Sequence, residues 1–222
     1  KLGKNIGDDL AEGKATLPLI YALENSNSQD KKIIIETLKN GKIENLDKVR
    51  NIIINSGAID ATINIAKDEI DQAKNYYEKA YSLNRNSSLA LNKVLDVYSA
   101  KNDLKGAIEI ATEFISRNNR KGEIHQRLAD FYLANKEYTK SINAYQLAVK
   151  YAADKSATLS SFAAAQIKMR NPDGAIGNLQ KAIAWNEDSI GAYIKLIDLF
   201  ADKRNEDEAL NVINSLSMKI DF

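Results

Sequence analysis

The sequence predicts an all-α protein: a right-handed superhelical solenoid of antiparallel helix pairs, preceded by an N-terminal group of short helices. Two observations lead to this fold class. A pattern of apolar and small residues recurs every 34 residues over the C-terminal two-thirds of the chain, and such a period is typical of helix pairs stacked into a solenoid. The chain also has only two prolines and ten glycines in 222 residues, which favours long uninterrupted helices.

The first elements are short helices with recognisable ends. Ser28 is a candidate N-cap for a helix that runs to Asn40, and Asn45 for the next, which Gly57 closes. One long helix then covers residues 58–83. This long helix has no linker-like segment inside it, although it joins two different sequence patterns.

The repeats follow this helix as four helix pairs. A half-repeat covers 67–87, and the full repeats cover 88–121, 122–155, 156–189 and 190–222. Neighbouring repeats should bury the same positions in each copy, and we expect a core that includes Tyr98, Tyr132, Phe162 and Phe200.

Asparagine marks most of the turns between these helices. Asn and Asp tolerate left-handed backbone and cap helix starts, which suits tight helix-to-helix turns. The turns predicted in this way are Asn84-Arg85-Asn86, Asn102-Asp103, Asn118-Asn119, Asn171-Pro172-Asp173 and Arg204-Asn205.

The repeat resembles the tetratricopeptide repeat (TPR) family over about 68–222. The second copy carries the family's large, small and aromatic positions as Leu128, Ala129, Tyr132, Tyr145 and Ala148. The copies also depart from the pattern: Val94 and Leu95 replace Leu and a small residue, Gln166 replaces Tyr, and the helix-ending Pro is missing. The resemblance implies a non-catalytic module for protein–protein interaction or scaffolding.

The N-terminal segment, residues 1–66, has a sequence pattern that differs from that of the repeats. Residues 3–18 read Gly-Lys-Asn-Ile-Gly-Asp-Asp-Leu-Ala-Glu-Gly-Lys-Ala-Thr-Leu-Pro. This stretch resembles the C-terminal region of polyprenyl diphosphate synthases of the octaprenyl type, and the match extends loosely to about Lys74. Ala15 stands where that family often has Pro.

The synthase resemblance implies an alternative function, prenyl transfer in isoprenoid biosynthesis. These enzymes ionise an allylic diphosphate with Mg²⁺ ions held by two DDxxD motifs, and carboxylates suit that ion. The resemblance places Lys14 at a position that contacts the diphosphate. Residues Asp8-Asp9-Leu10-Ala11-Glu12 look like a DDxxD motif, but they align after the second motif of the family. The chain therefore has no pair of DDxxD motifs. We therefore predict no catalytic residues and no cofactor, with Mg²⁺ needed only if a longer synthase parent exists.

The TPR resemblance also implies where a partner segment would bind. In that family the first helix of each pair lines a concave groove, and the corresponding positions here include three aspartates in four repeats. A row of acids favours a basic or extended partner and argues against recognition of a carboxylate terminus. Three aspartates could equally be a solvated helix face. The predicted groove residues are Asn92, Asp96, Gln126, Asp130, Lys168, Asp198 and Asp202.

Composition excludes several other classes of function. The chain has 31 basic and 30 acidic residues, for a net charge of +1, so nothing steers it toward nucleic acid. The absence of cysteine excludes disulfides and thiolate metal sites, and no metal site is expected. No apolar stretch is long enough for a membrane span. We expect a soluble protein of the bacterial cytoplasm or periplasm, with the compartment itself undetermined.

Three single features complete the predictions. The one histidine, His125, and the one tryptophan, Trp185, are expected to be packing residues. The last helix is apolar along one side, with Leu210, Ile213 and Met218 among its residues. A terminal repeat needs a polar outer face, so we expect either further repeats in a longer parent or self-association through this end.

Overall fold

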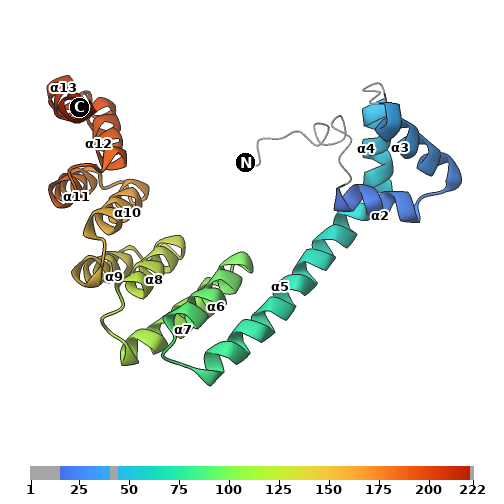
Figure 1. Cartoon of the computed structure of the whole chain (residues 1–222), viewed down its shortest axis with the longest axis horizontal. Helices are drawn as coiled ribbons and strands as arrows, with labels where there is room; N and C mark the ends of the chain where they lie inside the picture. The colour runs from blue at the N-terminus through green and yellow to red at the C-terminus, as the bar shows by residue number, and fades with distance from the viewer. Residues whose placement is uncertain (1–15, 41–44, 221–222) are drawn as a thin grey trace. The chain divides into compact units, whose positions relative to one another are not determined.

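The computed structural model describes residues 16–40 and 45–220, and within these ranges the secondary structure is helical, with no strand. This confirms the predicted all-α class. The chain divides into two compact units between Ala73 and Lys74, inside the long helix α5 (Ala58–Leu83) (Figure 1). The boundary predicted from sequence, between residues 66 and 67, lies in the same helix. It remains a prediction, because packing contacts do not show where a segment of separate ancestry ends.

The first unit contains α2 (Leu17–Asn25), α3 (Ser28–Asn40), α4 (Leu46–Asn55) and the beginning of α5. Each helix contributes apolar side chains to one small core, which buries Leu19, Ala22, Ile34, Val49, Ile52, Ile53 and Ala58. Exclusion of these side chains from water stabilises the unit.

The helix ends of this unit differ in one detail from the prediction. The side-chain oxygen of Asn27 accepts hydrogen bonds from the backbone N–H groups of Gln29 and Asp30, at 3.0 and 2.9 Å. Asn27 therefore caps α3, and the prediction of Ser28 was wrong by one residue. Gly57 follows α4 with φ of 71°, the left-handed conformation that glycine adopts without strain.

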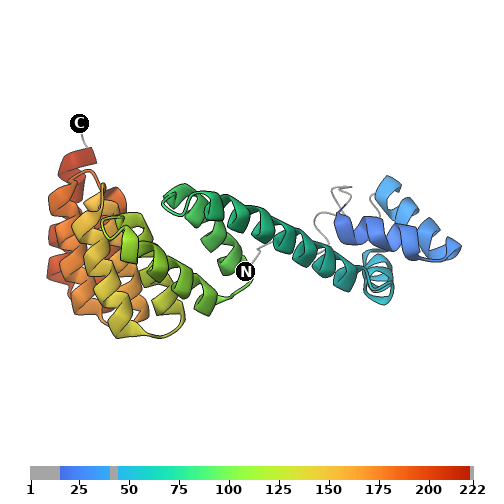
Figure 2. The same ribbon diagram turned by 90° about the horizontal axis from the view of Figure 1, so that it is seen from below.

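The second unit continues from α5 into four antiparallel helix pairs, as predicted. The four first helices lie along the inner side of a curve, and the four second helices lie along the outer side (Figure 1). Seen from below, the helices stack side by side (Figure 2). The pairs are α6 (Ser88–Ala100) with α7 (Leu104–Arg117), α8 (Gly122–Ala134) with α9 (Tyr138–Tyr151), α10 (Lys155–Lys168) with α11 (Pro172–Trp185), and α12 (Ile190–Asp202) with α13 (Glu206–Ile220).

One turn geometry joins the two helices of every pair. At the same position of each repeat a non-glycine residue has a left-handed backbone: Asn102, Lys136, Arg170 and Arg204, with φ between 55 and 62°. The next amide donates a hydrogen bond to the carbonyl five residues back, as in Asp103 to Tyr98 at 2.9 Å. This is the Schellman arrangement, which satisfies the last carbonyls of a helix. Asparagine was predicted for these turns, but three of the four left-handed residues are basic.

The predicted core is correct for phenylalanine and only half correct for tyrosine. Phe162 and Phe200 are buried, whereas Tyr98 and Tyr132 are half-buried and pack against the edges of the core. Tyr98 lines a cleft between α5 and α7, which leaves its ring partly open to solvent. The most deeply buried large aromatics are Tyr145 and Phe114, with 1% and 0% of their surface exposed.

The end of α5 packs as a half-repeat, which confirms the prediction for this helix. Tyr81 of α5 is buried in one cluster with Leu91 and Val94 of α6. Its ring also lies 6.5 Å from the ring of Phe114. The second unit therefore begins within α5, before the first complete pair.

Candidate functional site

The predicted groove residues all lie on the first helices of the pairs, α6, α8, α10 and α12, which form the inner side of the second unit. We call the exposed and half-exposed side chains of α6, α8, α10 and α12 on this side the inner face. Many are small, including Ala134, Ala157 and Ala201. Two isoleucines, Ile167 and Ile194, are also exposed there, at 42% and 50%. Small side chains let a partner backbone approach the helices closely.

Arg127 pairs with the first acid of the predicted row. Its guanidinium donates to the Oδ1 atom of Asp96 at 2.7 Å and to the backbone carbonyl of Asn92 at 3.0 Å. Arg127 lies on α8 and its partners on α6, so the contact joins neighbouring repeats. The predicted residues Asn92 and Asp96 are thus brought together, but Asp96 is already neutralised. Sequence analysis missed Arg127, because a pair between different helices leaves no local spacing signal.

Asp130, the second acid, is bound by a buried tyrosine. The hydroxyl of Tyr145 donates a hydrogen bond to Asp130 Oδ1, and the Tyr145 ring stacks on Phe162 at a centroid distance of 4.8 Å. Burial raises the pKa of the Asp130 carboxyl, while the hydrogen bond from Tyr145 and the charge of Lys168 act in the opposite direction. Asp130 therefore helps to hold α8 against α9, and its charge faces the predicted residue Lys168.

The remaining predicted residues lie on α8, α10 and α12. Gln126 is half-buried, and Lys168, Asp198 and Asp202 are exposed. Within the described part of the chain, Asp198 and Asp202 form no ion pair, unlike Asp96. The acidic row predicted from sequence is therefore divided, with its unneutralised charge on α12.

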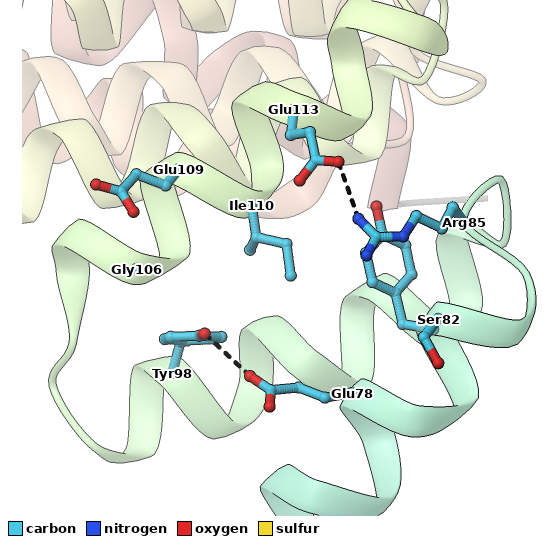
Figure 3. A pocket seen from close by; sticks show the side chains of 9 residues that line it. Glu78, Ser82, Arg85, Tyr98, Gly106, Glu109, Ile110 and Glu113 are labelled. Carbon is cyan, nitrogen blue, oxygen red and sulfur yellow. Dashed lines mark hydrogen bonds and ion pairs between the residues drawn. The ribbon is translucent and has the colours of Figure 1, made fainter.

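The outer side has a cleft between α5 and α7, shown in Figure 3. The cleft has a volume of about 450 Å³, and Ile110 points into it from α7. Two of the three carboxylates that line it, those of Glu78 and Glu113, are hydrogen-bonded within the protein. Tyr98 donates to Glu78 at 3.0 Å, and Arg85 donates to Glu113 at 3.0 Å. Gly106 stands over Tyr98, and a Cβ atom at this position would collide with the ring.

A related cleft recurs two repeats later, between α9 and α11. Its volume is about 510 Å³. Gln166 occupies the position equivalent to Tyr98 in the first cleft, and Gly174 occupies the position equivalent to Gly106. The side chain of Asn178 donates a hydrogen bond to Gln166 Oε1 at 2.7 Å. The departure of Gln166 from the repeat pattern thus has a structural counterpart, a buried amide pair.

The two aromatic packing predictions have opposite outcomes. His125 is buried, its Nε2 atom lies 2.8 Å from the carbonyl oxygen of Asn119, and its ring stacks with Tyr151. Trp185 is 62% exposed, with the ammonium of Lys155 over its ring at 4.2 Å, so the prediction of a packed tryptophan was wrong. A signal was present, because the same position in earlier repeats holds Leu83, Arg117 and Tyr151. Such mixed polarity indicates an edge.

Other predicted features can be placed only in part. Lys14 lies outside the described residues, as does most of the synthase-like motif. Among the described residues, no group of three acidic or histidine side chains could hold a metal ion. None of the helices described is both long enough and apolar enough to cross a membrane.

Comparisons with known proteins agree with this geometry. The tetratricopeptide repeat model matches residues 61–87 and 122–155. The second unit has the fold of a TPR array. A crystal structure of MamA aligns with a TM-score of 0.56 and 21% identity, covering 71% of this chain and 94% of that one. YrrB, described as a TPR protein with an unusual peptide-binding site, aligns with a TM-score of 0.50 and 17% identity, covering 64% and 73%.

The N-terminal segment has separate relatives. The polyprenyl synthetase model matches residues 1–54. Octaprenyl diphosphate synthase from Haemophilus influenzae is 45% identical over 73 residues, which is 32% of this chain and 22% of that enzyme. The matched region thus spans about a fifth of the length of this curated relative.

Proposed function

We propose that the TPR array is a non-catalytic module that binds an extended segment of another protein along its inner face, with a basic residue of that segment at α12. The observation that supports this most directly is the distribution of charge. Asp96 is paired with Arg127 at 2.7 Å, whereas Asp198 and Asp202 are exposed. The unneutralised acids give the inner face one preferred end for a lysine or arginine.

The rest of the inner face suits an extended backbone. The small side chains beside Ile167 and Ile194 leave room for a main chain and offer apolar contacts to its side chains. YrrB, a structural neighbour, is described as having a peptide-binding site, which supports a similar kind of ligand here. Peptide binding by such a surface needs no cofactor.

Charge reversal in a peptide tests this proposal. The probes are two fluorescein-labelled decapeptides of alternating Ala and Gln, one with two Lys substitutions and one with two Glu substitutions at the same places. We expect the Lys peptide to bind at least fivefold more tightly by fluorescence anisotropy. The double variant Asp198→Asn/Asp202→Asn should remove this preference. Glu206→Gln/Asp207→Asn, which neutralises two exposed acids on α13, should leave it unchanged. Equal binding of both peptides would contradict the proposal.

A prenyl-transferring enzyme is the second candidate, and the match of residues 1–54 favours it. The observation concerns only this segment, and the diphosphate-contacting role of Lys14 rests on the resemblance alone. The synthase function would require aspartate-rich motifs that are not in these 222 residues.

Self-association through α13 is a further part of this proposal. Leu210, Ile213 and Met218 of this helix are 56%, 42% and 67% exposed, and an exposed apolar face favours association. Sedimentation equilibrium should show dimer formation at high protein concentration. Leu210→Glu should weaken it at least tenfold, whereas Asn211→Glu, on an exposed polar position, should not. A strictly monomeric wild-type chain would contradict this part.

A further inference from the structure

The cleft between α9 and α11 contains hydrogen-bonding groups that the protein itself does not use. Gln166 and Asn178 line it and are 7% and 8% exposed. Asn178 donates its amide to Gln166 Oε1. The Nε2 group of Gln166 and the Oδ1 atom of Asn178 have no hydrogen-bond partner among the described residues. If both amides were turned over, one NH₂ group and one carbonyl oxygen would still be left.

Neither Gln166 Nε2 nor Asn178 Oδ1 is among the fully buried side-chain atoms that lack a partner, so both keep some contact with solvent in the cleft and are accessible to a ligand. The related cleft between α5 and α7 does not have this feature. Its position equivalent to Gln166 is Tyr98, whose hydroxyl is bonded to Glu78. The two clefts therefore lie at equivalent places in the array but differ in chemistry, because the amide pair of Gln166 and Asn178 is found in the second cleft.

A glycine in the wall of this cleft is a second, independent observation. Gly177 lies in the interior of α11, where glycine is less favourable than alanine. No atom of the protein lies within 4 Å of the position that its Cβ would occupy. Packing within the chain therefore gives no reason for glycine here. Its absent side chain keeps the wall of the cleft open.

We propose that this cleft binds the side-chain carboxamide of an asparagine or glutamine from a partner protein. A carboxamide carries its donor and acceptor together at one end, whereas a trans peptide bond has them on opposite edges. The partner's carbonyl accepts from Gln166 Nε2, and its NH₂ donates to Asn178 Oδ1. The apolar residues Val149, Leu159 and Phe162, which also line the cleft, contact the aliphatic part of the side chain.

The cleft should discriminate against charged analogues. A carboxylate is attracted by Lys181, another lining residue, but it has no N–H to donate to Asn178 Oδ1. A site built for hydrogen bonds rejects ligands that leave its polar groups unpaired. This second binding surface lies on the outer side of the array, so it is independent of peptide binding at the inner face.

The test uses ¹⁵N-labelled full-length protein and three small probes that share one backbone. These are the N-acetyl methylamides of glutamine, methionine and glutamate. The side-chain NH₂ signals of Gln166 and Asn178 are assigned with the variants Gln166→Leu and Asn178→Leu. We expect the glutamine probe to shift both NH₂ signals, and the other two probes to bind at least tenfold more weakly.

The variant Gly177→Ala separates binding from folding. Since nothing lies near its Cβ position, the variant should melt at the same temperature or higher, yet bind the glutamine probe at least tenfold more weakly. Gly191→Ala, also at a position with no atom within 4 Å but on α12, should bind it like the wild type.

Three results would overturn the proposal. Absence of any shift with the glutamine probe shows that no carboxamide site exists. Equal shifts with the methionine probe show recognition of the probe backbone instead. Tighter binding of the glutamate probe shows an anion site at Lys181.

Discussion

Tyr98 shows how a half-buried side chain acquires a pH dependence. Burial, and then the hydrogen bond to Glu78, raises the pKa of its hydroxyl from 10.0 to about 12. Because the folded-state pKa is the higher one, the protonated hydroxyl stabilises the fold below pH 10, and this contribution is lost as the pH rises toward 12. The difference in tyrosinate absorbance between wild type and Tyr98→Phe should show a midpoint near pH 12. Glu78→Gln should lower that midpoint. A midpoint near 10 would be evidence against the hydrogen bond.

Tyrosines of different burial should differ in their contribution to stability. Tyr145 is buried and stacks on Phe162, so Tyr145→Ala should lower the free energy of unfolding by about 3–5 kcal/mol through the cavity it creates. Tyr132 is half-buried, and Tyr132→Ala should cost roughly half as much. Urea denaturation measures both, with Tyr138→Ala as the control at an exposed position. Equal effects at Tyr132 and Tyr145 would show that the core is centred elsewhere.

The turn within each helix pair contains a residue with a strained, left-handed backbone, and a substitution by glycine can remove that strain. Lys136 has φ of 62°, where a side chain is disfavoured by roughly 1–2 kcal/mol. Lys136→Gly should therefore raise the free energy of unfolding by about 0.5–1 kcal/mol, after the greater freedom of glycine in the unfolded chain is subtracted. Lys195→Gly, within α12, should lower it by about 0.5–1 kcal/mol instead. Thermal unfolding measures the stability of both variants relative to the wild type. A loss of stability in both would contradict the inference that the backbone at Lys136 is strained.

The elements also show which features the sequence can predict. The repeat positions were predictable because stacking buries the same sites in each copy, as for Leu91 and Leu159. The amide pair of Gln166 and Asn178 was not, because it depends on how α10 packs against α11. Arg127 was missed for the same reason, since its partners lie on the preceding repeat. Interactions between elements follow from packing geometry, which a single helix pattern does not contain.

At the scale of the whole molecule, α5 is shared by two units that are similar to different protein families. The first unit overlaps the polyprenyl synthetase match, and the second unit has the TPR fold. Ancestry alone does not supply an active site.

We predict that the 222-residue chain, mixed with allylic and homoallylic diphosphates and Mg²⁺, forms no prenyl product, because it has no pair of DDxxD motifs to hold the metal. Chromatography of the products tests this, with Lys14→Ala as the matched control. Turnover that depends on Lys14 would contradict the prediction.

The exposed position of Trp185 has a consequence for spectroscopy. It is the only indole in the chain, and 62% of its surface is in contact with water. Its fluorescence in the native state should already resemble that of a solvated tryptophan, so unfolding changes its emission maximum little. The buried tyrosines report on the core instead. A blue shift of the indole emission in the folded protein would therefore signal that another molecule covers this edge of the array, beside Lys155.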